Sequence, residues 1–225
     1  MKKPHAPIES SVIRILLVDD HPIVREGFRA LLQREPGFEV CGEVGTVKGA
    51  QELIAAQAPH LAIVDVLLGN ESGVELIRGI QGINPSVRIL ACSIFDDRLY
   101  AERALAAGAT GYINKRAAPS QLIEAIRSVM SGNVFLSESM KQHIIHRSVC
   151  RESLSLESPI ETLSNRELEI FKLIGHGLTT AEISSRLLVS TKTIETHRQN
   201  IRRHLQLDNT HKLAREAAQW VLENG

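Results

Sequence analysis

Residues 12–28, VIRILLVDDHPIVREGF, decide the fold of the first half of the chain. The run at 12–18 is mostly apolar and rich in β-branched residues, which is typical of a buried strand. Two aspartates follow it, and Pro22 then stands near a helix start, where a missing N–H costs least. The stretch therefore predicts a strand, a polar turn and a helix over residues 22–34.

The same alternation continues to about residue 130. Further strand candidates lie at 38–44, 61–64, 87–93 and 111–113, and further helix candidates lie at 46–57, 72–82, 96–107 and 119–131. Short β-branched runs that alternate with amphipathic stretches predict a parallel sheet with crossover helices. We therefore expect an α/β fold, a doubly wound five-stranded parallel sheet of flavodoxin-like shape.

The pattern changes after residue 131. Residues 132–160 are polar with one amphipathic stretch and end in Ser158 and Pro159, which indicates a linker between domains. A wholly helical segment follows, and its expected N-terminal caps are Ser164 and Glu167, Thr179 and Glu182, Ser190, and Asn209. We expect a first domain at 1–131, a linker at 132–160, and a small all-α four-helix domain with a helix-turn-helix at 161–225.

Composition excludes several classes of protein. A chain of 225 residues that is 43% hydrophobic and 23% charged is neither disordered nor collagen-like. Its apolar runs are shorter than the roughly 20 residues of a membrane helix, and no apolar core follows its first lysines. We therefore expect a cytoplasmic protein without membrane contacts. The three cysteines are far apart, so they predict neither a zinc site nor a disulfide framework.

Polar residues follow several of the expected strands. Asp19 and Asp20 follow the first, Asp65 the third, Ser93 the fourth and Lys115 the fifth. In a doubly wound sheet the carboxyl ends of the strands meet at the ligand-binding edge. Carboxylates gathered there repel one another unless a cation lies among them, and Mg²⁺ suits such a group. A lysine and a hydroxyl suit phosphoryl oxygens, and an aspartate beside a metal can accept a phosphoryl group.

Each of these residues also has an ordinary structural explanation. A carboxylate after a strand often caps a helix or holds a turn, a lysine is often solvated, and a serine often forms a turn. Their coincidence at one edge of the sheet favours a phosphoryl site.

Four segments resemble the receiver domain of bacterial two-component response regulators: ILLVDDHPIVREGF at 15–28, IVDVLL at 63–68, ILACS at 89–93 and GYINK at 111–115. Residues 163–207, from LSNRELEIF to RRHLQL, are similar to the LuxR-type helix-turn-helix. Together they resemble the NarL/FixJ architecture over the whole chain except the tail and most of the linker.

The resemblance implies roles for particular residues. Asp65 is the expected phosphoacceptor. The expected Mg²⁺ site consists of Asp20, Asp19, Asp65 and the Leu67 carbonyl. Lys115 is expected to pair with the phosphoryl group, Ser93 to be the switch hydroxyl and Tyr112 the switch aromatic. Strand packing is the alternative explanation for Tyr112.

The loop after Asp65 departs from the family pattern. Gly69 stands where proline is common, and Leu67 is apolar where larger or polar side chains often lie. We expect metal binding to survive, because Leu67 contributes only its backbone, but the lifetime of the phosphoryl group to differ. Asn114 is polar where an apolar residue is usual, and Arg116 replaces a common acid. These two departures from the family pattern could change the geometry of the switch near Lys115.

Residues 190–205 contain the local basic patch of a chain whose net charge is zero. An α-helix fits the major groove of DNA, with base contacts near its N-terminus and phosphate contacts on its flanks. We expect base contacts from Glu195, Thr196 and Gln199, and phosphate contacts from Lys192, Arg198, Arg202 and Arg203, with Thr193 also at the DNA. Two alternatives remain: the patch is a solvated helix face, or Glu195 pairs with Arg198 or Arg202.

These features predict a transcription factor and not an enzyme. A sensor histidine kinase is expected to phosphorylate Asp65, and the protein is expected to bind double-stranded promoter DNA as a homodimer when phosphorylated or DNA-bound. A second hypothesis retains DNA binding but makes the receiver a phosphate-independent binding module. A third is a flavodoxin-like enzyme or phosphohydrolase that uses Asp19 and Asp65, but it lacks a Gly-rich phosphate loop and leaves the C-terminal helices unexplained.

Overall fold

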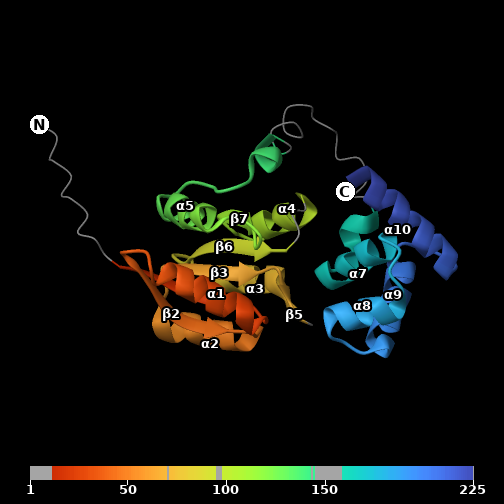
Figure 1. Cartoon of the computed structure of the whole chain (residues 1–225), viewed down its shortest axis with the longest axis horizontal. Coiled ribbons are helices and arrows are strands. Elements are labelled where there is room, and N and C mark those ends of the chain that lie inside the picture. The colour runs from red at the N-terminus through yellow and green to blue at the C-terminus, as the bar shows by residue number, and fades with distance from the viewer. Residues whose placement is uncertain (1–11, 70, 95–97, 143, 145–158, 225) are drawn as a thin grey trace, which may run out of the picture. The chain divides into compact units, whose positions relative to one another are not determined.

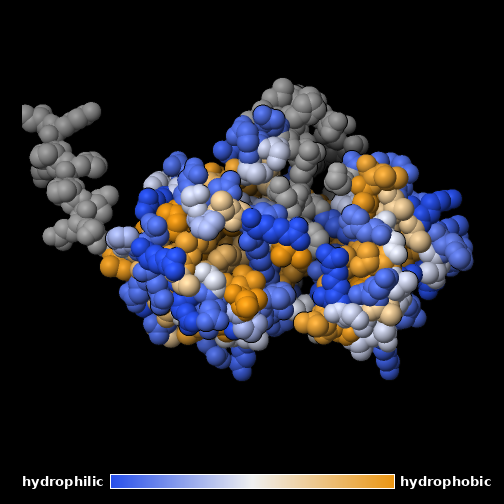
Figure 2. Space-filling view, in the orientation of Figure 1, coloured by the Kyte–Doolittle hydropathy of each residue, from blue (hydrophilic) through white to orange (hydrophobic). Residues whose placement is uncertain are grey.

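The computed structural model describes residues 12–69, 71–94, 98–142, 144 and 159–224. The chain divides into two compact units, residues 1–149 and 150–225. Among the described residues, no helix combines the length and the apolar composition needed to span a bilayer. On the face drawn in Figure 2, hydrophilic residues predominate over both units and apolar ones are scattered among them.

The first unit is built on a five-stranded parallel sheet with the strand order β2-β1-β3-β6-β7 (Figure 1). The strands are β1 (Ile13–Val18), β2 (Phe38–Val44), β3 (Leu61–Asp65), β6 (Arg88–Ser93) and β7 (Gly111–Asn114). All five predicted strands are confirmed, with ends that differ by one residue or none. The central strand β3 is buried along its whole length, as expected when helices cover both faces of a sheet.

Four helices connect these strands, and a fifth follows β7: α1 (Pro22–Leu32), α2 (Val47–Gln57), α3 (Gly73–Ile83), α4 (Arg98–Ala106) and, after β7, α5 (Pro119–Met130). Prolines begin α1 and α5, as the sequence predicts. Alternate residues of β1, such as Ile15 and Leu17, pack with Leu32 of α1 and Ile126 of α5 in one core cluster. The doubly wound α/β fold is therefore confirmed.

A short antiparallel hairpin after β3 was not predicted. It pairs β4 (Leu67–Leu68) with β5 (Glu71–Ser72). Gly69, in the turn, has a φ of +54°, a left-handed conformation that proline, fixed near −65°, cannot adopt. The Glu71 carboxylate accepts a 3.0 Å hydrogen bond from the backbone N–H of Val47 at the start of α2. The hairpin is thus fixed to a neighbouring helix.

The chain after α5 adds to the edge of the sheet. The backbone N–H of Tyr112 donates to the carbonyl of Phe135 at 2.9 Å, and Phe135 donates to the carbonyl of Thr110 at 3.3 Å. These bonds satisfy part of the exposed edge of β7. The first residues of the segment predicted as a linker therefore pack on the first unit, and residues 138–142 are helical. Residues 145–158 of that segment lie outside the described residues.

The described part of the second unit, residues 159–224, is helical, as predicted. Its elements are the 3₁₀ turn η1 (Pro159–Thr162) and the helices α7 (Asn165–Gly175), α8 (Thr180–Leu187), α9 (Thr191–His204) and α10 (Thr210–Asn224). The helices bury Ile183, Ile194, Ile201 and Leu213 completely. The ring of Phe171 meets Trp220, the only tryptophan of the chain, edge to face at a centroid distance of 6.2 Å.

The predicted helix caps of this unit are present. Ser190 Oγ accepts from the N–H of Thr193 at 3.0 Å, and Asn209 Oδ1 accepts from Lys212 at 2.9 Å. Ser164 with Glu167 and Thr179 with Glu182 each form a reciprocal capping box. These caps fix where α9 begins after the short turn that follows α8.

Candidate functional site

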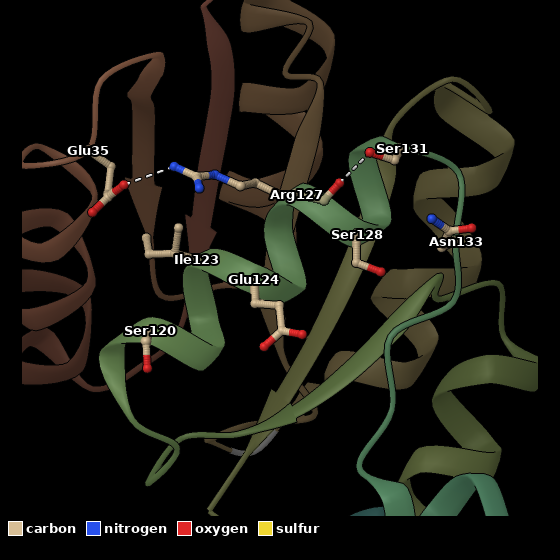
Figure 3. A pocket seen from close by; sticks show the side chains of 8 residues that line it. All are labelled: Glu35, Ser120, Ile123, Glu124, Arg127, Ser128, Ser131 and Asn133. Atoms are coloured by element: carbon tan, nitrogen blue, oxygen red, sulfur yellow. Dashed lines mark hydrogen bonds and ion pairs between the residues drawn. The ribbon is translucent and has the colours of Figure 1, made fainter.

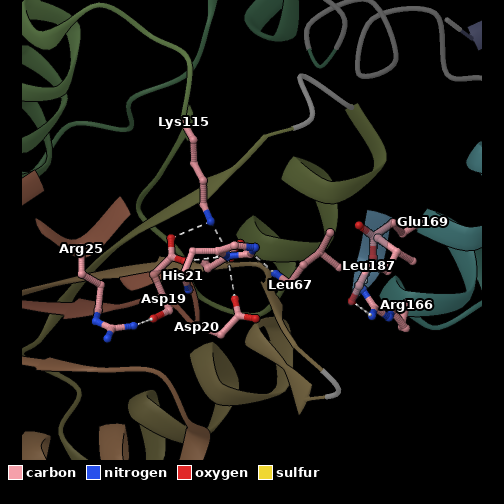
Figure 4. Close-up of polar contacts among 10 residues, drawn as sticks. Asp19, Asp20, His21, Arg25, Leu67, Lys115, Arg166, Glu169 and Leu187 are labelled. Carbon is pink, nitrogen blue, oxygen red and sulfur yellow. Dashed lines mark hydrogen bonds and ion pairs between the residues drawn. The ribbon is translucent and has the colours of Figure 1, made fainter. Parts of the chain in front are cut away.

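The carboxyl ends of three parallel strands form an acidic cluster in the first unit. Asp19 and Asp20 follow β1, Asp65 is the last residue of β3, and Lys115 follows β7. Because the strands are parallel, their polar ends converge on one edge of the sheet. Figure 4 shows the Lys115 side chain reaching from its strand to the group around Asp19, Asp20 and His21.

Lys115 bridges two of the buried carboxylates. Its Nζ lies 2.6 Å from Asp19 Oδ2 and 2.6 Å from Asp65 Oδ2. Asp19 and Asp65 are each 2% exposed, and the Lys115 side chain is 5% exposed. The second oxygen of Asp65 accepts a 3.0 Å hydrogen bond from the backbone N–H of Leu67. Lys115 therefore compensates part of the negative charge of the two buried carboxylates.

The environment shifts the pKa values of this pair. Burial raises the pKa of Asp65 well above its ordinary value, and the negative charge of Asp19 raises it further, against the opposing effect of Lys115. Burial acts to lower the pKa of Lys115, but the negative groups around it outweigh this effect and raise that pKa above its ordinary value. Lys115 is therefore a permanent positive charge beside Asp65 near neutral pH.

The cluster fits a divalent cation. Ligand atoms of Asp19, Asp20, His21 and Asp65 lie within 4.8 Å of one another. Asp19 Oδ2 and Asp20 Oδ1 are buried oxygens that accept no hydrogen bond within the described residues, although cationic or imidazole nitrogens lie 2.6 and 2.9 Å away, respectively. Carboxylate oxygens are the protein ligands that Mg²⁺ prefers.

Four residues that sequence reasoning missed support the cluster. His21 donates its backbone N–H to Asp19 Oδ1 at 2.9 Å, and the Arg25 guanidinium donates to the Asp19 carbonyl. A Cβ at Gly45 would meet Asp19 and Arg25 at 3.4 Å, and one at Gly73 would meet the Asp65 carbonyl at 1.8 Å. Adjacency to the aspartate pair could have indicated His21 and Arg25. The close packing at Gly45 and Gly73 could not be predicted from the sequence, in which the only sign of it is the glycine itself.

The remaining expected switch residues are buried nearby. Ser93 ends β6, is fully buried, and accepts the Lys115 backbone N–H on its carbonyl at 2.7 Å. Tyr112 is 3% exposed and lies three residues before Lys115 in β7. Asn114, one of the departures from the family pattern, accepts the Arg116 backbone N–H on its side chain at 2.8 Å and thus holds the turn after β7.

Two hollows of the first unit do not contain the acidic cluster. Figure 3 shows one of about 570 Å³ along α5, where Arg127 forms a 3.1 Å ion pair with Glu35 and Ser131 Oγ donates to the Arg127 carbonyl at 2.8 Å. It gathers none of the predicted site residues. The other, of about 430 Å³, is mostly apolar, runs between α1 and α5, and has Lys115 in its wall.

In the second unit, α9 presents the predicted DNA-contacting residues. Ile194 and Ile201 turn into the core, as the helical spacing predicts. Among the predicted contact residues, five side chains are exposed and three are partly buried. The exposed ones are Lys192, Glu195, Thr196, Gln199 and Arg203, and the partly buried ones are Thr193, Arg198 and Arg202. The Arg198 side chain is only 12% exposed, so little of it is accessible for the predicted phosphate contact.

The Glu195 side chain contacts two helices. Its Oε1 accepts a 2.7 Å hydrogen bond from Thr180 Oγ1 at the start of α8, and it lies 3.9 Å from Arg198 Nε. The predicted pairing of Glu195 with Arg198 is thus present at a long distance. Thr180 is a partner that sequence reasoning missed, because residues 15 positions apart on two helices share no sequence pattern.

Each of the two units matches a known protein family. Residues 15–127 match the family model of the response regulator receiver domain, and residues 161–217 match that of the luxR family of bacterial regulatory proteins. The response regulator UvrY of Escherichia coli K12 is 33% identical over 83% of this chain and 85% of its own length. The oxygen regulatory protein NreC of Staphylococcus epidermidis is 33% identical over 91% and 96%.

Solved structures agree. A LuxR-family two-component response regulator from Aurantimonas sp. SI85-9A1 is 36% identical, with a TM-score of 0.58 over 62% of this chain and 99% of that chain. RcsB of Salmonella enterica bound to the rprA promoter is 23% identical, with a TM-score of 0.57 over 92% and 98%, and shares the fold. The chain therefore belongs to the response regulators, with a receiver domain followed by a LuxR-type DNA-binding domain.

Proposed function

We propose that Asp65 accepts a phosphoryl group and that this controls the binding of promoter DNA by α9. The observation that supports this most strongly is the position of Asp65. It is buried at a strand end, with Lys115 Nζ at 2.6 Å and the Leu67 N–H at 3.0 Å. A buried carboxylate with a fixed cation beside it is suited to attack phosphorus and to keep the added charge compensated.

In the proposed step, a carboxylate oxygen of Asp65 forms a bond to phosphorus while the bond from phosphorus to the donor's leaving group breaks. The leaving group departs with the bonding electrons, and Asp65 becomes an acyl phosphate. Lys115 compensates the negative charge on the phosphoryl oxygens, and the Leu67 N–H holds the carboxylate in place. Sensor histidine kinases are the proposed donors in the cell.

Mg²⁺ is the proposed cofactor. Asp20 and Asp19 would hold it through their carboxylate oxygens, together with Asp65 and the Leu67 carbonyl. When bound, it supplies positive charge that stabilises the transferring phosphoryl group. Its binding also relieves the mutual repulsion of three neighbouring carboxylates.

The proposed switch uses the strand ends beside Asp65. A phosphoryl group adds negative charge and acceptor oxygens, which can draw the Ser93 hydroxyl inward and allow Tyr112 to follow. The two residues lie on neighbouring strands, and the β6–β7 register sets Ser93 opposite Asn114 and Ala91 opposite Tyr112. A displacement at Ser93 therefore passes directly to β7.

Promoter DNA is the proposed partner of the second unit. The proposed contacts with double-stranded DNA come from Lys192, Thr193, Glu195, Thr196, Arg198, Gln199, Arg202 and Arg203. We propose a homodimer in the phosphorylated or DNA-bound state, which suits paired half-sites. Leu222, near the end of α10, is an apolar residue that is 82% exposed and available to such an interface. This function belongs in the cytoplasm, where promoter DNA is, and it is regulatory and not that of a metabolic enzyme.

A phosphate-independent receiver is the second candidate. The observation that favours it is the left-handed φ at Gly69, where a Cβ would lie 3.3 Å from Asp20 Oδ2. The loop therefore approaches Asp20 with a backbone conformation that proline cannot adopt, so the surroundings of the acidic cluster differ from the family pattern.

Phosphoryl incorporation distinguishes the two candidates. The full chain is incubated with a small acyl phosphate and Mg²⁺, and its mass is measured intact and after proteolysis. We expect one phosphoryl group on the peptide that contains Asp65, and none in Asp65→Asn. The matched control Asp208→Asn, a carboxylate of the second unit paired with Lys212, is expected to label fully. Absence of label in the parent would support the phosphate-independent module.

A further inference from the structure

The carboxylate of Glu195 is held by residues of two helices. Thr180 Oγ1, at the first position of α8, donates to Glu195 Oε1 at 2.7 Å. Arg198 Nε, one helical turn further along α9, lies 3.9 Å from the same oxygen. Glu195 is nevertheless 55% exposed, so its other side faces solvent. A long flexible side chain is thus fixed on the exposed face of the helix that is proposed to enter the major groove.

The two oxygens of this carboxylate are used differently. Oε1 takes both contacts, whereas Oε2 has no hydrogen-bond or ion-pair partner within the described residues. A carboxylate oxygen in the major groove accepts from the exocyclic amino group of a base, and cytosine N4 is the usual donor to a glutamate. Arg198 offsets part of the repulsion between Glu195 and the DNA phosphates.

The Thr180 hydroxyl has no role in capping α8. The N-cap is Thr179, whose hydroxyl accepts from the Glu182 backbone and whose own N–H donates to the Glu182 side chain. Within the described part of the chain, the hydrogen bond to Glu195 is the only one that the Thr180 side chain makes. A hydroxyl that is not needed for its own helix is free to serve the neighbouring one.

We propose that Thr180 is a specificity-determining residue: it positions Glu195 so that Oε2 reads an amino-bearing base, cytosine first, at one position of each DNA half-site. The inference rests on the proposed binding of DNA by α9. It assigns base selection to a pair of residues on two helices and not to the recognition helix alone.

Loss of the Thr180 hydroxyl should weaken selection at one base pair only. The orientational freedom that Glu195 regains corresponds to about a 2- to 12-fold loss of preference for cytosine there. Affinity for non-specific DNA should stay the same, because Thr180 contributes no charge. A phosphate contact would instead change the affinity for all sequences together.

Enrichment of random double-stranded DNA by the full-length protein, with acyl phosphate and Mg²⁺, tests this proposal. The proteins are the parent, Thr180→Val, Thr180→Ser and Glu195→Ala. Thr180→Val matches the shape of threonine without the hydroxyl, and Thr180→Ser retains the hydroxyl. The fluorescence of Trp220, the single tryptophan, follows the unfolding of the second unit and checks that each variant is folded.

We expect the parent to enrich cytosine at one half-site position, Glu195→Ala to lose that preference, and Thr180→Val to weaken it there alone. Thr180→Ser should restore it. A Thr180→Val protein that keeps the full preference, or that loses affinity equally for all sequences, would overturn the proposal while DNA binding stands. A parent that enriches no sequence would overturn the proposed DNA-binding function itself, and this inference with it.

Discussion

The acidic cluster and the exposed face of α9 are built in opposite ways. The cluster takes residues from three strand ends, buries Asp19, Asp65 and Lys115 to a few per cent exposure, and links these three by charge and hydrogen bonds. The α9 face comes from one helix, and most of its side chains are exposed. Substitutions in the cluster should therefore change stability and function together, whereas those on α9 should change DNA binding alone. Glu195 is an exception on the α9 face, because its side chain is held by a residue of another helix, Thr180 of α8.

The largest effect is expected at Gly73, the closest backbone approach in the cluster. A Cβ there would lie 1.8 Å from the Asp65 carbonyl oxygen, so the Gly73→Ala protein must displace the end of β3. We expect a loss of about 3 kcal/mol in the free energy of unfolding of the receiver, as for a severe overpacking change. Urea denaturation followed by far-UV circular dichroism measures it.

Gly82→Ala is the matched control on the same helix, because nothing lies within 4 Å of a Cβ at that position. It should be neutral or stabilising by up to about 1 kcal/mol, since alanine favours helices. Equal stability of the Gly73 and Gly82 variants would contradict the close approach at Asp65.

The next effect concerns metal binding. Mg²⁺ at about 100 times its dissociation constant should raise the unfolding free energy of the receiver by about 2.7 kcal/mol. Asp20→Asn should remove most of that gain, because it replaces a negatively charged carboxylate of the candidate ligand group with a neutral amide. Thermal unfolding with and without Mg²⁺ measures the gain, and Asp208→Asn is the control. An unchanged gain in Asp20→Asn would show that Mg²⁺ binds elsewhere.

On α9, Lys192→Ala should weaken DNA binding without changing stability. Lys192 is exposed at the start of the helix, and loss of one phosphate contact should lower the slope of log K against log salt by about 1 for all sequences. Its unfolding free energy should change by less than about 0.5 kcal/mol. Fluorescence anisotropy over a salt series measures the slope. Lys212→Ala, in α10 beside Asp208, should keep the parent slope.

The smallest effect is expected in the turn between α8 and α9. Leu188 is 88% exposed and has a φ of +53°, which a leucine adopts only at a cost. Leu188→Gly should raise the unfolding free energy of the second unit by up to about 1 kcal/mol. The fluorescence of Trp220 during urea denaturation measures it. A loss of stability instead would mean that the Leu188 side chain contributes packing that its exposure hides.

The strands and the acidic residues were predictable from sequence for the same reason. A buried parallel strand requires an apolar β-branched run, and the first polar residue after it marks the strand end, as Asp19 and Asp65 do. The N-caps of the C-terminal helices were equally readable, because a side-chain cap requires particular residue types such as Ser190 and Asn209.

Other features leave no comparable signal. The β4–β5 hairpin depends on the left-handed Gly69 and on the contact of Glu71 with α2, and both result from tertiary packing. The approach of Gly73 to Asp65 and the bond of Thr180 to Glu195 each join residues of two different secondary-structure elements. Such contacts follow from the fold and not from local pattern.

The most direct measurement of the central claim is the DNA affinity of the full chain with and without an acyl phosphate donor and Mg²⁺, beside Asp65→Asn. The sequence selected in the enrichment serves as the target. We expect the donor to tighten binding by the parent by about 5- to 150-fold, the usual range of coupling between two sites, and to leave Asp65→Asn unchanged. Equal affinity of both proteins with and without donor would contradict phosphorylation control through Asp65.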